Sequence, residues 1–326
     1  MSHWTLKSIP PHDWTLCLDM QVYFDHEHDP EEIFERGFHR PIRAGEKDIV
    51  VTIQFNGNPE APEFAIHTDE DLSKDEIQDA NRSLSRILGT DLDLRPLYDQ
   101  AGNDPLLGPL LSTLYGLKRM SRASLFEDTV NRIVEMQMSH KPTAKKMMYR
   151  IRENYGQLIP FEGKTLATWP TPAQLKGADP EAIRGMGPTR RKGEYISEFA
   201  ARLDQRELDL EWMDRAATAK EFLEAISDVR GIGPTAAQDL MLYRPTTQAY
   251  FPSSKVKGEE KGLRKWIILS YGGDPSRTSD AEFERMIKPW KGCEASAIEF
   301  FHLNWVMEYK RLKAERKRQK ESQKKT

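Results

Sequence analysis

The chain is poor in cysteine and has no long apolar run, and each shortage excludes a class of protein. Its 326 residues include two cysteines, Cys17 and Cys293, far apart in the sequence. Two thiols cannot form a disulfide framework or hold an iron–sulfur cluster, which needs about four ligands. No apolar stretch approaches the ~20 residues that a membrane-spanning helix requires. His3, Lys7 and His12 interrupt the start of the chain, so we expect no secretory signal and a cytoplasmic protein.

Basic charge is scarce in the first third of the chain. Residues 1–100 contain 9 Lys and Arg against 21 Asp and Glu, whereas residues 101–326 contain 39 against 30. Within the latter, residues 310–326 hold 9 basic and 2 acidic side chains in a low-complexity run, which predicts a basic tail. An acidic N-terminal part disfavours contact with nucleic acid, so we expect any such contact to be local and to lie in the remainder.

The first hundred residues have the pattern of a mixed α+β domain. β-branched and aromatic residues with partial alternation predict strands at 14–23, 48–55 and 63–67. Apolar residues at helical spacing predict a helix over 74–88, with Ser73 as its N-cap. The cluster DHEHD at 25–29 is interpreted as an exposed acidic loop, and we predict no metal site there.

Beyond a turn-rich stretch at 99–105 the apolar periodicity becomes helical. Ser124 followed by Glu127 is a capping-box pattern that predicts the start of a helix over 125–136, and a second helix is predicted over 142–155. The sequence therefore predicts the α+β class: a small mixed β-sheet domain over 1–100, an all-α core over 101–309 and the tail over 310–326.

A glycine-rich hexapeptide separates two predicted helices in the second half of the chain. RGIGPT occupies 230–235, between helical patterns at 219–229 and 236–243. The first N–H groups of a helix are unpaired and its dipole is positive there, so such a turn favours an anion. The pattern indicates a helix-hairpin-helix that grips a nucleic-acid backbone, with a plain helix connection as the alternative. A near copy, RGMGPT at 184–189, supports a helical-hairpin architecture without indicating a second DNA contact.

Together with this turn, a series of motifs in fixed order resembles one known family. In chain order they are PHDW (11–14), GFHRP (37–41), DPLLGPL (104–110), FED (126–128), MQMS (136–139), WPTP (169–172), GADP (177–180), the hexapeptide, FP (251–252), KPWK (288–291) and HLNW (302–305). They cover nearly the whole chain and resemble the bacterial 3-methyladenine DNA glycosylase II family, within the helix-hairpin-helix DNA glycosylase superfamily.

The resemblance implies a base-excision repair enzyme that hydrolyses the N-glycosidic bond of an alkylated purine after base flipping. By position, Gln137 would fill the gap left by the flipped nucleotide, and Trp290 and Ser254 would line the base pocket. The backbone would be held by Arg230, Gly231, Ile232, Gly233, Pro234 and Thr235. No cofactor would be required, although a monovalent cation is expected at the hairpin. The partner would be double-stranded DNA with a damaged base. We expect no membrane partner and a monomer in the cytoplasm with the nucleoid.

Two positions depart from the family's pattern. Thr235 stands where lyase-competent relatives carry a lysine, which implies a monofunctional glycosylase. The aspartate that the family places shortly after a Phe-Pro pair is missing, because Phe251 and Pro252 are followed by Ser253, Ser254 and Lys255. In the family this carboxylate stabilises the oxocarbenium-like sugar or orients the water.

Three explanations for the missing aspartate stay open. Glu260, displaced along a longer loop, would be the acid, unless it belongs to a charged surface loop. Asp239, one helical turn beyond the hairpin, would point into the site instead. In the third explanation the chain is a catalytically inactive homologue that binds DNA and recognises lesions. The candidate catalytic residues are therefore Glu260 and Asp239, and no metal-binding residue is predicted.

Overall fold

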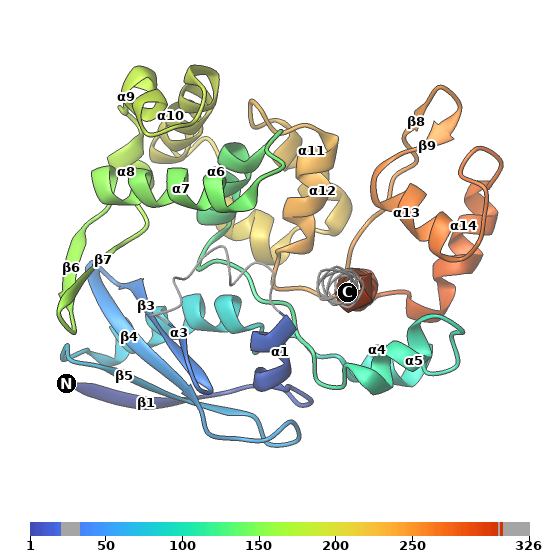
Figure 1. Ribbon diagram of the computed structural model, residues 1–326, viewed down its shortest axis with the longest axis horizontal. Coiled ribbons are helices and arrows are strands. Elements are labelled where there is room, and N and C mark those ends of the chain that lie inside the picture. Colours follow the sequence, from blue (N-terminus) through green and yellow to red (C-terminus); the bar gives the residue numbers. More distant parts are fainter. Residues whose placement is uncertain (21–32, 306, 309–326) are drawn as a thin grey trace, which may run out of the picture.

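The computed structural model describes residues 1–20, 33–305 and 307–308 of the chain. An antiparallel sheet of five strands forms the N-terminal part, in the order β1-β5-β4-β3-β2 (Figure 1). Its strands are β1 Ser2–Lys7, β2 Ile33–Phe34, β3 Gly37–Ala44, β4 Lys47–Phe55 and β5 Glu63–Thr68. The predictions of strands at 48–55 and 63–67 are confirmed, and so is an α+β fold with an N-terminal sheet.

Helix α3, Lys74–Leu88, covers one face of this sheet and matches its sequence prediction at both ends. The Ser73 hydroxyl accepts a hydrogen bond from the Glu76 backbone N–H, and the Glu76 carboxylate accepts one from Ser73 N–H. This reciprocal cap satisfies two N–H groups that helix geometry leaves unpaired. Gly89 ends the helix in the left-handed conformation, with φ +66°.

The predicted strand over 14–23 is wrong in its described part, because Trp14–Met20 forms helix α1. The Asp13 carboxylate accepts a hydrogen bond from Leu16 N–H, 2.9 Å away, and so caps the helix start. Trp14 and Cys17 are both fully buried, three residues apart, which is helical rather than strand spacing. The aromatic and apolar composition of the segment reflects this buried face.

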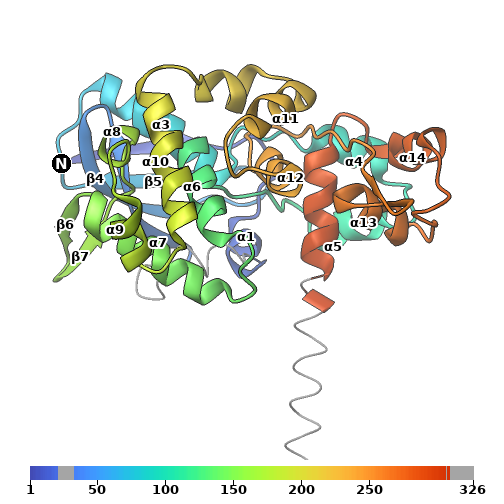
Figure 2. The ribbon, with the colours of Figure 1, turned by 90° about the horizontal axis from the view of Figure 1, so that it is seen from above.

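The helical part is built of two lobes that are interleaved in sequence. One lobe contains α6 to α12, and the other contains α4 and α5 together with α13, α14 and η3 (Figures 1 and 2). The helices are α4 Arg95–Ala101, α5 Leu107–Thr113, α6 Leu125–Glu135, α7 Lys141–Tyr155, α8 Pro172–Leu175, α9 Pro180–Gly185, α10 Arg190–Asp204, the π-helix η2 Trp212–Ala216, α11 Ala219–Ser227, α12 Pro234–Leu242, α13 Gly262–Ser270, α14 Asp280–Ile287 and the 3-10 helix η3 Lys288–Trp290. Residues 294–305 are also helical and run between the lobes (Figure 2).

The core over 101–309 is predominantly helical, but it is not strictly all-α, because two β-hairpins interrupt it. β6 Leu158–Phe161 and β7 Lys164–Ala167 pair across Glu162 and Gly163, whose positive φ angles of 48° and 77° make a tight hairpin turn. Phe161 packs against His39 of the N-terminal sheet, with ring centroids 4.9 Å apart. The second hairpin pairs β8 Lys255–Val256 with β9 Glu259–Glu260. Both hairpins are too short for strand periodicity to reveal them in the sequence.

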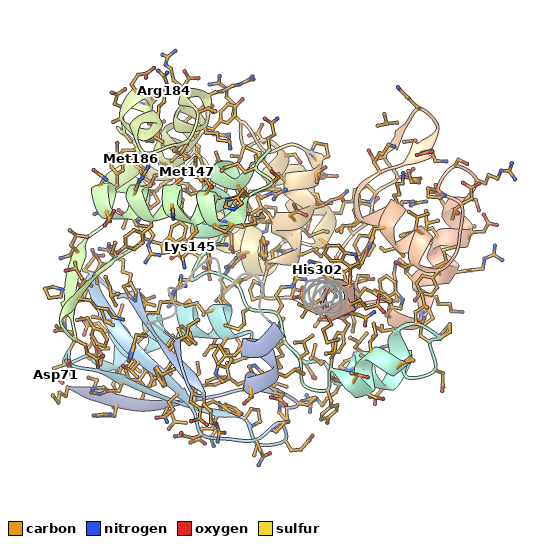
Figure 3. The ribbon with its side chains drawn as sticks, in the orientation of Figure 1. Asp71, Lys145, Met147, Arg184, Met186 and His302 are labelled. Atoms are coloured by element: carbon orange, nitrogen blue, oxygen red, sulfur yellow. The ribbon has the colours of Figure 1, made fainter. Side chains whose placement is uncertain are left out.

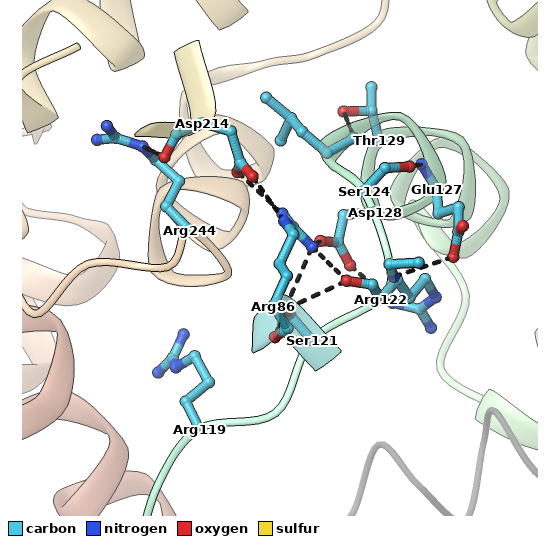
Figure 4. Close-up of polar contacts among 12 residues, drawn as sticks. Arg86, Arg119, Ser121, Arg122, Ser124, Glu127, Asp128, Thr129, Asp214 and Arg244 are labelled. Atoms are coloured by element: carbon cyan, nitrogen blue, oxygen red, sulfur yellow. Dashed lines mark hydrogen bonds and ion pairs between the residues drawn. The ribbon is translucent and has the colours of Figure 1, made fainter. Parts of the chain in front are cut away.

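A buried ionic junction joins α3 of the sheet domain to the first helical lobe (Figure 4). The Arg86 guanidinium lies 2.6 Å from the Asp128 carboxylate of α6 and 2.7 Å from the Asp214 carboxylate of η2. Arg122 contacts the other Asp128 oxygen at 3.2 Å. Each charge therefore has a partner where water is excluded, which ties α3, α6 and η2 into one arrangement.

The structure does not test every prediction made from the sequence. The acidic loop at 25–29 and the basic tail at 310–326 lie outside the described residues. The domain boundary between residues 100 and 101 stays a prediction. Of the helices that the structure describes, none combines the length and apolar character needed to span a bilayer.

Candidate base cleft and nucleic-acid interface

The hexapeptide at 230–235 forms the predicted turn between α11 and α12. Ile232 is buried and its N–H donates to the Val229 carbonyl at 2.9 Å, which folds the turn back on α11. Gly231 has φ +95°, and a Cβ atom there would lie 2.3 Å from the Tyr195 ring. Only glycine combines this backbone conformation with so close an approach, so Gly231 is required by the fold.

The start of α12 is open to solvent and has no side-chain cap. Gly233 is the N-cap residue with φ −84°, and Pro234 occupies the first turn, where a missing N–H costs nothing. Gly233, Pro234 and Thr235 are all exposed. The free N–H groups and the positive end of the helix dipole therefore face solvent, where a phosphate would be bound.

Arg230 contributes less free charge to this turn than its type suggests. Its guanidinium lies 2.8 Å from the Glu198 carboxylate and 5.2 Å from the centroid of the Tyr195 ring. These contacts hold the side chain against α10. The anion-binding capacity of the turn therefore comes mainly from the backbone.

The near copy at 184–189 has a similar turn but a different helix start. Gly187 takes φ +121°, with the Met147 side chain packed where a Cβ atom would be. Thr189 is the N-cap of α10, and its hydroxyl accepts the Lys192 N–H at 3.3 Å. At the N-cap of α10 the Thr189 hydroxyl therefore satisfies a backbone N–H group, whereas at the N-cap of α12 Gly233 has no side chain to do so. This difference favours a structural role for the upstream turn.

A cleft of about 320 Å³ lies between the two helical lobes. One wall comes from α6, the start of α7 and α12, and the other from α13 and the 294–305 helix. Its lining is rich in charge of both signs and contains two aromatic side chains. The lining residues are Arg119, Arg122, Asn131, Arg132, Glu135, Lys141, Asp239, Leu242, Tyr243, Leu263, Trp266, Ile298, Glu299 and His302.

Asp239 is the candidate catalytic residue that the structure places in this cleft. It lies on α12, and its carboxylate forms an ion pair with Arg132 of α6. Its side chain is 31% exposed and lines the cleft. Burial raises the pKa of Asp239 above its ordinary value, against the opposing effect of Arg132 and Lys141.

Glu260, the other candidate acid, lies outside the cleft lining. Its side chain is fully buried, where it accepts hydrogen bonds from the Ser253 hydroxyl at 2.6 Å and the Ser254 N–H at 2.9 Å. The Arg264 Nε atom lies 3.3 Å from the same carboxylate. Glu260 therefore closes the loop from 253 to 260 and joins it to α13. The interpretation of this residue as part of a charged surface loop is wrong, because the side chain is turned inward.

Neither predicted base-pocket residue lines the cleft. Trp290 is fully buried, and its indole N–H donates to the Tyr271 hydroxyl at 3.0 Å. Its ring packs edge-on against Phe301, which packs in the same manner against Trp266 of the cleft wall. Trp290 is thus one aromatic layer behind the surface. Ser254 is exposed on the β8 side of the loop, where its carbonyl accepts the Lys261 N–H.

Gln137 lies at the exposed turn after α6, beside the cleft wall. Its φ of +60° is unusual for a residue other than glycine. Lys192 holds the preceding backbone by donating to the Val134 and Met136 carbonyls at 2.7 and 2.6 Å. The turn therefore presents Gln137 on a braced backbone, which suits a residue that must enter the DNA stack.

Several cleft residues were absent from the sequence-based candidates. Lys141 and Glu135 pair at 2.5 Å, and the pKa of Glu135 is lowered because Lys141 and Arg122 outweigh the effect of its burial. Trp266 and His302 come from the opposite wall. His302 belongs to the HLNW motif, but that motif assigned it no role, and Trp266 lies in no motif. The helices that carry them meet α12 only through the fold, so the sequence did not place them in the cleft.

The comparisons with known proteins indicate one fold family. No protein-family model matches the chain. It is 26% identical over 207 residues to a DNA-3-methyladenine glycosylase of Bacillus subtilis, and the match covers 64% of this chain and 66% of that relative. A 3-methyladenine DNA glycosylase from Archaeoglobus fulgidus has a similar structure, with a TM-score of 0.70 at 21% identity over 93% of this chain and 98% of that one.

A second group of similar structures has a different named substrate. The 8-oxoguanine glycosylase/lyase of Clostridium acetobutylicum, in complex with double-stranded DNA containing cytosine opposite 8-oxoguanine, gives a TM-score of 0.64. Its identity is 17%, over 95% of this chain and 99% of that one. These likenesses show the fold, and together with the curated relative they confirm the resemblance to helix-hairpin-helix DNA glycosylases.

Proposed function

We propose that this chain, with its helix-hairpin-helix DNA glycosylase fold, is a base-excision repair N-glycosylase that releases alkylated purines from double-stranded DNA. The observation that carries the proposal is the position of Asp239. It is a partly exposed carboxylate in an inter-lobe cleft, on the same helix whose N-terminus is open to a phosphate. One rigid helix would thus fix the DNA backbone relative to the reacting sugar.

Each part of the interface has a role in this proposal. The α12 N-terminus binds a backbone phosphate, and Gln137 enters the stack as the damaged nucleotide turns into the cleft. There the base stacks on Trp266, because an electron-deficient alkylated purine is attracted to an indole face. Trp290 supports this wall from behind through Phe301.

The reaction is hydrolysis of the bond between the base nitrogen and C1′ of the sugar. The bonding electrons leave with the base, and positive charge develops on the sugar. The Asp239 carboxylate stabilises that charge or orients the water that adds to C1′. An N3- or N7-alkylated purine already carries positive charge, so it leaves as a neutral base with little acid assistance. The water's proton passes to the solvent.

The proposed enzyme is monofunctional and acts as a monomer on chromosomal DNA in the cytoplasm. Thr235 has no amine to form a Schiff base at the position where lyase-competent relatives have one. Lys141 of the cleft is held in an ion pair by Glu135. No cofactor is required, and a monovalent cation at the hairpin carbonyls stays a prediction.

The test is a single-turnover assay on duplex DNA carrying one alkylated adenine, with the released base quantified. We expect base release by the wild type and a loss of about 100-fold or more in Asp239→Asn, because the substituted amide cannot balance the developing charge. Glu260→Gln should retain the chemistry at temperatures where it stays folded, since its carboxylate closes a loop. A parallel substrate carrying 8-oxoguanine defines the preferred lesion.

The catalytically inactive, lesion-binding alternative has its own outcome in this assay. It requires that the wild type release no base from either substrate while binding lesion DNA more tightly than undamaged DNA. It draws on the missing aspartate after Pro252 and on the ion pair that engages Asp239. Equal activity of wild type and Asp239→Asn would contradict the assignment of the carboxylate.

A further inference from the structure

Within the part of the chain that the structure describes, the basic side chains and carboxylates of the cleft lining are paired with protein groups, with one exception. Arg132 pairs with Asp239, and Lys141 pairs with Glu135. On the other side Arg119 pairs with Glu299. Arg122 contacts Asp128 at 3.2 Å. These pairs fix the charge pattern of the cleft before any ligand enters.

His302 is the exception. It lies on the 294–305 helix, near the centre of the view in Figure 3, and it lines the cleft while half-buried. Among the described residues, neither of its ring nitrogens has a hydrogen-bond or ion-pair partner. Its recorded contact is a stacked one, with Trp305 at 6.4 Å between ring centroids and 16° between planes. Neither nitrogen is among the buried unpartnered atoms, so water satisfies this edge until a ligand replaces it.

His302 belongs to the face of the 294–305 helix that is turned toward the cleft. Ile298, Glu299 and His302 all line the cleft, so this helix turns one continuous face toward it. Trp305 continues that face beyond the cleft and is 56% exposed. The Trp305 ring lies nearly parallel to the imidazole, with its centroid 6.4 Å away.

We propose that His302 is a specificity-determining residue that hydrogen-bonds the edge of the flipped base, an inference that rests on the proposed glycosylase function. A neutral imidazole has one donor nitrogen and one acceptor nitrogen that point in diverging directions, so one of them meets a complementary position on the purine edge. Trp266 recognises the face of the base and is tolerant of its identity. His302 distinguishes one purine edge from another, because an unmatched edge leaves a polar group unpaired.

The test compares His302→Phe and His302→Gln with the wild type in two measurements. Single-turnover excision from duplex DNA with one alkylated adenine reports contact with the base. Affinity for the same duplex with an abasic-site analogue reports contact with the backbone, since that ligand has no base. His302→Phe keeps the ring stack on Trp305 but removes both nitrogens. His3→Phe is the matched control, since His3 also stacks on a ring, that of His67, on the N-terminal sheet.

We expect His302→Phe to lower the single-turnover excision rate by about 10- to 100-fold while abasic-DNA affinity stays within about twofold. His302→Gln, which keeps a donor and an acceptor, should recover part of the loss and change the ratio between alkylated adenine and 8-oxoguanine. His3→Phe should match the wild type. Unchanged excision in His302→Phe, or an equal loss of excision and abasic binding, would overturn the inference. A wild type that excises neither base contradicts the proposed glycosylase function instead.

Discussion

Asp239 differs from an ordinary surface aspartate through its neighbours. Arg132 pairs with it directly, while Glu135 lies near enough to oppose its ionisation. Burial is the largest influence, and the net effect is a raised pKa. The proposed chemistry needs the ionised carboxylate, so this residue should set the acid limit of activity.

The pH dependence of base release follows from that direction. The active carboxylate exists above its pKa, so activity should fall as the pH drops through a value higher than that of a free aspartate. Arg132→Gln removes a group that lowers the pKa and should move the acid limb to still higher pH. Single-turnover rates across a pH series, corrected for spontaneous base loss, locate the acid limb of the wild type and that of Arg132→Gln. If the acid limbs of the two proteins coincide, Asp239 is not the group that sets the acid limit of activity.

At the scale of elements, the hairpin contains two glycines with opposite requirements. Gly231 is fixed by its left-handed backbone and by Tyr195, whereas a Cβ atom at Gly233 meets nothing within 4 Å. Gly233 also has an ordinary backbone conformation, φ −84° and ψ 173°. A larger side chain is therefore compatible with the fold at Gly233, and it would obstruct the open helix start.

Gly233→Leu should weaken binding to duplex DNA by about tenfold at moderate salt, because the side chain keeps a phosphate away from the α12 N–H groups. Its melting temperature should stay close to that of the wild type. Gly231→Ala is the contrast, and it should lower the melting temperature. Titrations of a fluorescent duplex together with thermal unfolding separate the two effects. Unchanged affinity in Gly233→Leu would contradict the hairpin assignment.

At the scale of the whole molecule, the cleft depends on how three parts are held together. The ionic junction around Arg86 joins the sheet domain to the first lobe. The second lobe is held across the cleft by Arg119, which contacts Glu299 and the Leu242 carbonyl. These contacts connect residues far apart in sequence, so their loss affects the assembly rather than one element.

Asp128→Asn tests the junction. Asp128 is fully buried and its carboxylate faces Arg86 and Arg122, so neutralising it leaves buried positive charge uncompensated. We expect a loss of about 3–5 kcal/mol in the free energy of unfolding, measured by urea denaturation. Asp93→Asn is the matched control, because its partner Arg95 is 62% exposed, and its cost should stay below about 1 kcal/mol. Similar losses in both variants would contradict a special role for the junction.

The sequence by itself determined the local features of the fold, such as helix starts, helix ends and tight turns. Helix α3 and its cap at Ser73, the start of α6 at Ser124, and the turn around Gly231 all follow from hydrogen bonds or backbone conformations within a few residues. Helix α1 was mistaken for a strand because its aromatic and apolar residues suit either element. The Asp13 cap and the burial of both Trp14 and Cys17 identify it as a helix. The motif series likewise indicated the superfamily.

Only the tertiary structure decided the content of the cleft. The sequence left Glu260, Asp239 and an inactive site open, with Glu260 favoured over Asp239. The fold buries Glu260 within its loop and turns Asp239 toward the cleft. It also placed Trp266 on the surface and Trp290 a layer behind it. The physical reason is that the cleft forms where lobes far apart in sequence meet. Which side chain faces that space depends on long-range packing, which local patterns do not encode.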